Sequence, residues 1–325
     1  MVKAIRVHEP GGVEVLKWEA VELQPVGPGE IRLRHTAIGV NLVDAYMRSG
    51  MLPPPRYPYI PGMEAAGVVI AVGEGVTSCH VGQRVAYAGR PTGSYSEERT
   101  MMADRVVAIP EGICDETAAA ITLKGMTAHM LLDEMFRVSP GLFVLVHTAA
   151  GGLGAVLAQL AHSLGAVVIG TVSSEAEAEM AMENGVTHPI IYTSEDLVQR
   201  VQEITQGEGV AVVFGGEGED TLRRLADCLE PRGLLFSYGP TYGDPPSFHV
   251  SQVSKRGALR MFKPPMFEYE APRVEVVRRA EAIFSMVLSG VIKVRVSDRY
   301  PLAEASNAHA LLEAGNATGS IVLVP

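Results

Sequence analysis

The sequence is poor in cysteine. Only Cys79, Cys114 and Cys228 occur among its 325 residues, and they stand far apart. This odd, scattered set can build neither a disulfide framework nor a four-cysteine zinc lobe. The sequence also lacks a run of the roughly 18 apolar residues that a membrane-spanning helix needs, and no apolar block typical of a secretory signal follows Met1. We therefore expect a cytoplasmic protein with no membrane association.

Basic residues are also comparatively few. The 27 lysines and arginines face 37 aspartates and glutamates, which leaves a formal net charge of -10. Because a positive field attracts phosphate backbones, this balance argues against nucleic-acid partners. A domain typically holds roughly 100 to 200 residues, so the length favours two domains. Hydrophobic residues make up 47% of the chain, which is enough for two sizeable cores.

The pattern of the sequence changes near Pro110. Before it, short alternating stretches between glycines and prolines predict antiparallel strands at 3–8, 31–37, 66–72, 84–88 and 105–109. A helix is then expected over 115–136. After that, apolar strands alternate with helices, which predicts a parallel sheet covered by helices on both faces. The strands expected in this second part are 142–147, 167–172, 189–192, 210–214 and 234–238.

The last part of the chain fits neither pattern. It predicts a helix over 272–289, a strand over 293–297, a helix over 303–313 and a closing strand over 320–324. Such a closing strand could return to the first domain.

A glycine-rich turn, Ala149-Ala150-Gly151-Gly152-Leu153-Gly154, separates an expected strand from an expected helix. A small first residue permits the tight turn, Gly151 lets the backbone approach a pyrophosphate, and Gly154 lets the helix pack closely on the strand. The alternative is a turn that only packs a helix on a sheet. The strand-turn-helix context favours a dinucleotide site.

The end of the next strand distinguishes NADH from NADPH, because an acidic residue there takes the ribose 2′-hydroxyl and a basic one takes a 2′-phosphate. Ser173 and Ser174 stand there and leave room for a phosphate. Acidic residues at 175, 177 and 179 follow, with nothing basic nearby, and they also suit the first turns of a helix. The sequence favours NADPH but leaves NADH open as the alternative.

With these motifs placed, the chain resembles, from end to end, the zinc-free quinone oxidoreductases of the medium-chain dehydrogenase/reductase superfamily, the zeta-crystallin branch. The resemblance rests on GVNLVDAYMRSG at 39–50, PGMEAAG at 61–67, LKGMTA at 123–128, TAAGGLG at 148–154 and SGVIKV at 289–294. It implies an α/β fold in which a doubly wound Rossmann domain, residues 125–265, is inserted into a β-rich GroES-like catalytic domain, residues 1–124 and 266–325. It also implies a homodimer with the active site between the domains.

The resemblance further assigns site residues. Zinc-dependent relatives have a cysteine and a histidine where this chain has Asn41 and Met63, and an amide with a thioether does not suit zinc. No metal is therefore expected, and the hydride should pass to an acceptor that takes it readily. The catalytic residues implied are Asn41, Asp44, Tyr46 and Lys124. The cofactor contacts implied are Asn41, Thr127, Gly151, Gly152, Leu153, Ser173, Tyr192, Tyr238, Gly239, Phe262 and Asn316.

Some assignments have structural alternatives. Asp44 could cap its helix or pair with Arg48, and Lys124 could be a solvated charge. Relatives commonly carry a lysine at position 177, so Glu177 weakens the NADPH prediction. The function expected is metal-free hydride transfer from NADPH to quinones. The alternatives are an NAD(P)H-dependent reductase of activated carbonyls, namely enones, alkenals or enoyl thioesters, and a nucleotide-binding structural or RNA-binding protein like some crystallins.

Overall fold

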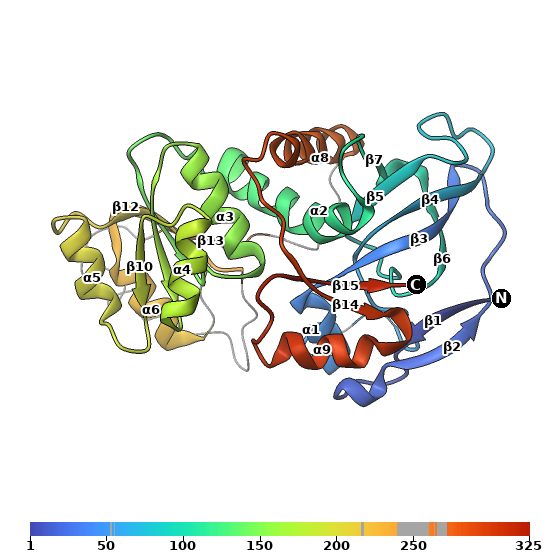
Figure 1. Cartoon of the computed structure of the whole chain (residues 1–325), viewed down its shortest axis with the longest axis horizontal. Helices are drawn as coiled ribbons and strands as arrows, with labels where there is room; N and C mark the ends of the chain where they lie inside the picture. The colour runs from blue at the N-terminus through green and yellow to red at the C-terminus, as the bar shows by residue number, and fades with distance from the viewer. Residues whose placement is uncertain (53, 55, 216–217, 239–259, 263, 265–271) are drawn as a thin grey trace. The chain divides into compact units, whose positions relative to one another are not determined.

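The computed structural model describes the chain except for residues 53, 55, 216–217, 239–259, 263 and 265–271 (Figure 1). The chain folds as two compact units. The first unit comprises Met1–Met126 together with Phe267–Pro325, and the second comprises Thr127–Met266. The first unit therefore takes residues from both ends of the chain, and the second is one insertion. Among the described residues, no helix is both long enough and apolar enough to cross a membrane.

The first unit is built around a seven-stranded sheet. Its strands follow the order β14-β15-β3-β4-β5-β7, with β6 also pairing with β3. Alternate residues of β3, beginning with Ile31 and Leu33, are fully buried, because side chains alternate between the two faces of a strand. The strands are β3 (Glu30–Val40), β4 (Glu64–Val72), β5 (Arg84–Ala88), β6 (Glu98–Met102), β7 (Val107–Ala108), β14 (Val296–Pro301) and β15 (Ser320–Val324), and a separate sheet pairs β1 (Val2–Arg6) with β2 (Lys17–Val21).

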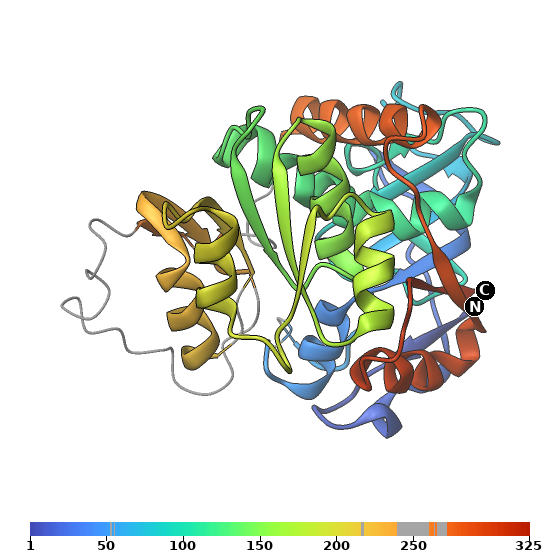
Figure 2. The same ribbon diagram turned by 60° about the vertical axis from the view of Figure 1, so that its left-hand side comes forward.

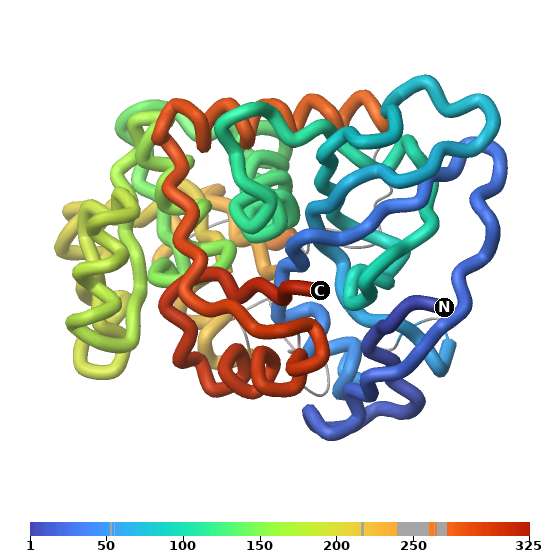
Figure 3. Tube along the Cα trace, turned by 45° about the vertical axis from the view of Figure 1, so that its right-hand side comes forward, coloured from blue at the N-terminus to red at the C-terminus, as the bar shows by residue number. Residues whose placement is uncertain are grey.

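The end of the chain completes this sheet. β15 pairs antiparallel with β3, so that Ile321 lies opposite Val40, and β14 pairs parallel with β15. Figure 3 shows this red C-terminal segment running beside the blue N-terminal part of the chain. The closing strand does return to the first domain, as the sequence suggested.

Helices flank the first sheet. α1 (Leu42–Ser49) packs on α9 (Ala305–Glu313), and the unit also holds α8 (Arg273–Leu288). The helix expected over 115–136 is present in two parts. α2 (Asp115–His129) is α-helical, and Met130–Met135 form a π-helical turn. The expectation of one continuous α-helix is therefore wrong in its last turn.

The second unit contains a six-stranded parallel sheet with the order β10-β9-β8-β11-β12-β13. The chain winds outward from β8 to β10 and then places β11 on the other side of β8. In such doubly wound sheets, ligands bind at the carboxyl ends of the strands where the order reverses. The strands are β8 (Phe143–His147), β9 (Val167–Val172), β10 (His188–Ile191), β11 (Val210–Phe214), β12 (Leu229–Phe236) and β13 (Arg260–Phe262).

In the part of this unit that the structure describes, four helices connect the strands. They are α3 (Gly152–Ser163), α4 (Glu175–Glu183), α5 (Leu197–Ile204) and α6 (Glu219–Asp227). Figure 2 shows them lying along the green and yellow strands. Ile169 and Val213 are fully buried in the core of this unit. The parallel sheet with connecting helices confirms the α/β fold class predicted from the sequence.

Candidate active site

The glycine-rich turn joins β8 to α3. Gly151 precedes the helix, and Gly152 has φ of +55°, in the left-handed region that favours glycine. A methyl group added at Gly154 would overlap the backbone carbonyl oxygen of Thr148, whereas one added at Gly151 or Gly152 would meet no atom within 4 Å. The turn is therefore packed tightly at Gly154 and open before the first turn of α3, where Leu153 is half-buried. Backbone N–H groups at such a terminus suit a pyrophosphate.

Hydrogen bonds fix the carboxyl end of β9. The Oγ of Ser174 accepts a hydrogen bond from the backbone N of Glu177 at 3.3 Å and so caps α4. The Oε2 of Glu177 accepts one from the backbone N of Ser173 at 2.7 Å. The Oγ1 of Thr193 donates to the carbonyl of Ser173 at 3.0 Å. The carboxylate of Glu177 is therefore held at the strand end where a cofactor ribose is expected.

Aromatic side chains gather at the same edge of the parallel sheet. The ring of Tyr192 lies 5.8 Å from the ring of His147, and the hydroxyl of Tyr238 donates to the carbonyl of His147 at 3.5 Å. His147 also bonds through Nδ1 to the Oγ1 of Thr171 at 2.6 Å. Burial, with the positive charge of Arg224, lowers the pKa of His147 to about 4. This imidazole is therefore neutral near pH 7.

The other residues assigned to cofactor contacts come from several elements. Phe262 ends β13, with its ring edge-on to Phe236 at 5.9 Å. Thr127 is buried in α2. Asn316 is exposed in the first unit, just after α9. Gly239 lies outside the described residues. Of the cofactor residues assigned by resemblance, the glycine turn, Ser173, Tyr192, Tyr238 and Phe262 share the carboxyl end of the parallel sheet.

Asn41 lies between β3 and α1 and belongs to a buried polar cluster. Its Nδ2 donates to the Oε2 of Glu64 at 2.9 Å, and Glu64 is fully buried. The other oxygen of Glu64 accepts from the backbone N of Leu123 at 2.6 Å. The Nζ of Lys124 lies 4.0 Å from Glu64 Oε2 and donates to the carbonyl of Ala120 at 3.3 Å. Burial raises the pKa of Glu64, and the charge of Lys124 opposes that rise. Lys124 is therefore not a solvated charge, because its side chain is only 11% exposed.

Asp44 lies in the first turn of α1 and is also buried. Its Oδ2 accepts hydrogen bonds from the backbone N of Asn41 at 2.9 Å and from the hydroxyl of Tyr95 at 3.2 Å. The hydroxyl of Tyr95 also bonds to Nε2 of His309 at 3.0 Å. Burial raises the pKa of Asp44 to about 7, although both hydrogen bonds oppose the rise. Asp44 therefore caps α1 and links it to α9, and with 1% exposure it does not face solvent.

Two other residues of α1, Arg48 and Tyr46, have partners outside the helix. Arg48 pairs with Glu313 of α9, with 2.6 Å between Nη2 and Oε1, and not with Asp44. Tyr46 is half-buried, and its carbonyl accepts a hydrogen bond from the backbone N of Leu52 at 3.0 Å. The local pairing considered for Asp44 is therefore wrong, and the capping alternative is confirmed.

Three members of these networks were missed from the sequence. A signal for Glu64 was present, because a carboxylate that opens an otherwise apolar strand must find partners when it is buried. Tyr95 and His309 gave no local signal. They lie 51 and 265 residues beyond Asp44, and only the fold brings the three side chains together.

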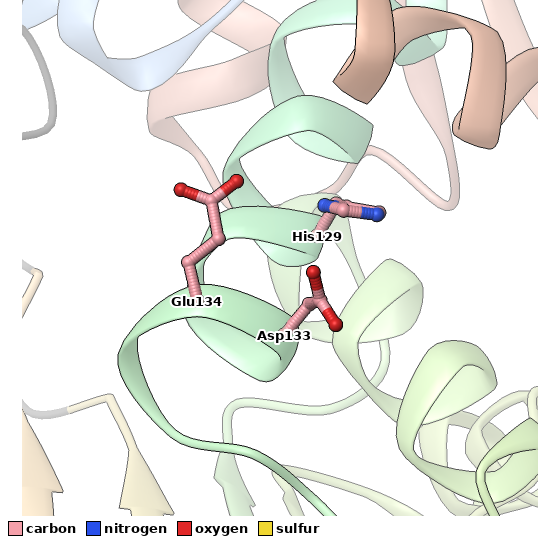
Figure 4. A group of neighbouring side chains, drawn as sticks. All are labelled: His129, Asp133 and Glu134. Atoms are coloured by element: carbon pink, nitrogen blue, oxygen red, sulfur yellow. The ribbon is translucent and has the colours of Figure 1, made fainter. Parts of the chain in front are cut away.

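A separate group of side chains has the composition of a metal site. His129 ends α2, and Asp133 and Glu134 lie in the π-helical turn that follows (Figure 4). Their possible ligand atoms lie within 4.8 Å of one another. The described part of the chain contains no other group of three such residues that are this close together. The positions of the zinc ligands in relatives, by contrast, hold Asn41, bonded to Glu64, and Met63, fully buried in the core.

Comparisons with known proteins agree with this arrangement. The model of the alcohol dehydrogenase GroES-like domain matches residues 27–118, and that of zinc-binding dehydrogenases matches 152–264. Quinone oxidoreductase 1 of Escherichia coli K12 is 41% identical over 329 residues, with both chains covered completely. A 2-haloacrylate reductase of Burkholderia is 42% identical over 332 residues, covering 100% of this chain and 99% of that protein.

Solved structures give the same result. The crystal structure of Escherichia coli quinone oxidoreductase complexed with NADPH superposes with a TM-score of 0.95 at 39% identity, covering 99% of this chain and 100% of that one. The GroES-like match falls in the first unit and the dehydrogenase match in the second. The expected combination of a GroES-like domain with a Rossmann domain is confirmed.

Proposed function

This chain belongs to the quinone oxidoreductases of the medium-chain dehydrogenase/reductase superfamily, and we propose that it transfers a hydride from NADPH to quinones without a metal. When bound, NADPH supplies the hydride, and a quinone that takes it together with one proton becomes a hydroquinone. The main support is the likeness of about 40% identity over the full length of proteins with that name.

The open turn supports the cofactor part of this proposal. No atom lies within 4 Å of a methyl group placed on Gly151 or Gly152, so the backbone there is free to approach a pyrophosphate. The backbone N–H groups of these glycines and of Leu153 hold the phosphates. Ser173 and Tyr192 would lie around the adenosine ribose, and Tyr238, at the same end of the sheet, would lie behind the nicotinamide.

The buried polar cluster supports chemistry without zinc. Glu64 holds the amide of Asn41 through a 2.9 Å hydrogen bond, in the place where zinc-dependent relatives have a thiolate. Glu64 is therefore a positioning residue. An amide is a poor zinc ligand, but hydrogen-bond donors can stabilise the negative charge that a quinone oxygen develops. Tyr46 and Lys124 are the candidates to donate to that oxygen. Asp44 is too deeply buried to touch the substrate, so it positions Asn41 instead.

A second candidate function has specific support. The 42% identity to a 2-haloacrylate reductase over the full length favours reduction of an activated carbon-carbon double bond. Such a substrate takes a hydride on one carbon and a proton on its neighbour, and the same hydrogen-bond donors stabilise the enolate formed between the two steps.

Kinetic assays separate these functions. The purified chain, treated with a chelator and untreated, is assayed for NADPH consumption with a panel of quinones and a panel of activated alkenes that includes enones and 2-haloacrylates. We expect equal quinone turnover with and without chelator. Turnover of the activated alkenes alone would favour the second candidate, and loss of activity after chelation would contradict the metal-free proposal. Cofactor binding without any turnover would favour a structural nucleotide-binding protein.

The quaternary structure and cellular location belong to the same proposal: a cytoplasmic homodimer. Among the described residues, β13 lies at the edge of the parallel sheet, and Met261 and Phe262 on it are exposed, which suits pairing with a second copy. The three cysteines are free thiols, as is usual in a reducing compartment. Light scattering on the purified protein should give twice the chain mass of 34.7 kDa, and a monomer would contradict the dimer.

A further inference from the structure

The carboxylate of Glu177 occupies the place where the two nicotinamide cofactors differ. They differ only in a phosphate on the 2′-oxygen of the adenosine ribose, and this ribose is read at the end of the second strand of a Rossmann sheet. Here that strand is β9, and Glu177 is tied to its end by the 2.7 Å hydrogen bond from the backbone N of Ser173. The carboxylate is therefore fixed and cannot swing away without breaking this bond.

Two donors that could otherwise bind a phosphate are already in use at this strand end. The N–H of Ser173 donates to Glu177, and the hydroxyl of Thr193 donates to the carbonyl of Ser173. The hydroxyl of Ser174 accepts from the backbone N of Glu177. A 2′-phosphate arriving here would meet an acceptor of its own charge sign, with the N–H of Ser173 and the hydroxyl of Thr193 already committed to other acceptors. A ribose hydroxyl, in contrast, can donate to that acceptor.

The sequence around this strand end supplies no compensating cation. Between Arg137 and Arg200 there is neither lysine nor arginine, over the whole span from β8 to β10. Arg200 itself is paired with Glu195 at 2.8 Å and Glu203 at 2.6 Å. The charge of Arg224 acts on His147 at the end of β8, one strand away. The acidic residues of this span are Glu175, Glu177, Glu179, Glu183, Glu195 and Asp196.

We propose that Glu177 sets the cofactor discrimination of this enzyme by repelling the 2′-phosphate, so that the chain accepts NADH alongside NADPH. The inference rests on the proposed function, because it assumes that the dinucleotide binds at the glycine turn. A phosphate carries a charge of about -1.5 to -2 at neutral pH. At a separation of about 6 Å and the high effective dielectric of a surface site, repulsion by one carboxylate weakens binding about tenfold.

The test compares two variants of α4. Glu177→Gln removes the charge but keeps an oxygen that accepts from the N of Ser173, so the cap of α4 is retained. Glu183→Gln is the matched control, since it removes one charge from the exposed C-terminal end of the same helix, about 9 Å further along its axis. Dissociation constants for NADPH and NADH are measured by titration of the purified chain without acceptor, and again with adenosine 2′,5′-bisphosphate and AMP. Thermal unfolding verifies that both variants fold.

We expect the ratio of the NADH to the NADPH dissociation constant to rise about tenfold in Glu177→Gln and to stay within about twofold in Glu183→Gln. The ratio for the two adenosine fragments should shift in the same direction. An unchanged ratio in Glu177→Gln, or an equal shift in both variants, would overturn this inference and leave the proposed function standing. Failure of the unmodified chain to bind either cofactor and either fragment would overturn both.

Discussion

The candidate site residues fall into two sets, one in each unit, which we call the two halves and which are built from residues of different kinds. The half in the second unit is a turn of small residues, in which the main contribution comes from the backbone and from space that glycine leaves open. The half in the first unit is a set of buried polar side chains, in which Asn41, Glu64 and Lys124 hold one another in place. One half depends on the absence of side chains and the other on their presence.

This difference implies that the two halves fail in opposite ways. The glycine turn is damaged when atoms are added, because its backbone is already in contact at Gly154. The polar cluster is damaged when atoms are removed, because each buried donor or charge then loses a partner that water cannot replace. Substitutions of both kinds test this contrast.

The largest expected loss of stability comes from a substitution in the glycine turn. Gly154→Val places a side chain where even a methyl group would overlap the carbonyl oxygen of Thr148, so we expect the second unit to lose more than about 4 kcal/mol of stability. Chemical denaturation followed by circular dichroism measures this loss. Gly151→Ala is the control, since its methyl group meets no atom within 4 Å. It should fold normally and bind NADPH more weakly. Equal stability losses in the two variants would contradict the contrast.

The next largest expected loss of stability comes from removing the carboxylate of Glu64. Glu64→Ala leaves the amide of Asn41, the backbone N–H of Leu123 and the ammonium of Lys124 without their shared acceptor, so we expect a loss of about 4 kcal/mol in the free energy of unfolding. Urea denaturation gives the value. The control is Glu98→Ala, which removes a half-buried carboxylate at the start of β6. It should lower the free energy of unfolding by less than about 0.5 kcal/mol. A small loss at Glu64 would mean that the cluster is not held together by its carboxylate.

Asp44 gives the polar half a distinctive pH dependence. Its pKa is raised from 3.8 to about 7, so the folded state holds a proton that the unfolded state releases. The resulting stabilisation is complete below pH 4 and is lost as the pH rises through 7, a change of about 4 kcal/mol. His309 acts in the opposite sense, because its pKa is lowered to about 3 and stability is lost as the pH falls below 6.5.

The contribution of Asp44 is therefore measured as a difference. Unfolding free energies of the unmodified chain and of Asp44→Asn are compared from pH 4 to pH 8, which cancels the contribution of His309. We expect the advantage of the unmodified chain over the variant to decline steadily with rising pH. Parallel curves would show that Asp44 does not hold a proton in the folded state.

The two halves also differed in how far the sequence predicted them. The strand, turn and helix that carry the glycines were predicted, because the three are neighbours in the chain and each glycine has a local task. Strands 84–88 and 320–324 also have the expected bounds, because the pattern that predicts each of them is local in the sequence. β6 was missed because Arg99 lies on its buried face, packed over the ring of Tyr87 at 5.1 Å, and a charge there hides the alternation of apolar residues.

The polar half was predicted only in part. Asn41, Asp44 and Lys124 lie in family motifs, but what each side chain touches depends on partners far away in the sequence. The contact of Tyr95 with His309 spans 214 residues and exists only because the end of the chain returns to the first sheet. A burial-driven pKa such as that of Asp44 cannot be predicted before those partners are in place.

The smallest expected effect comes from a comparison of two ion pairs. It tests whether burial, and not charge pairing as such, makes the stability of the polar half sensitive to substitution. Two ion pairs of the first unit have the same length, 2.6 Å: Arg48 with Glu313, and Arg299 with Glu116. They differ in burial, because the side chain of Arg48 is 3% exposed and that of Arg299 is 52% exposed. Glu313→Gln leaves a buried guanidinium without its counter-charge and should cost about 1 kcal/mol. Glu116→Gln should leave the unfolding curve unchanged, since water replaces the lost partner. If the two variants lose equal stability, pairing rather than burial governs these side chains, and the contrast between the two halves would need another cause.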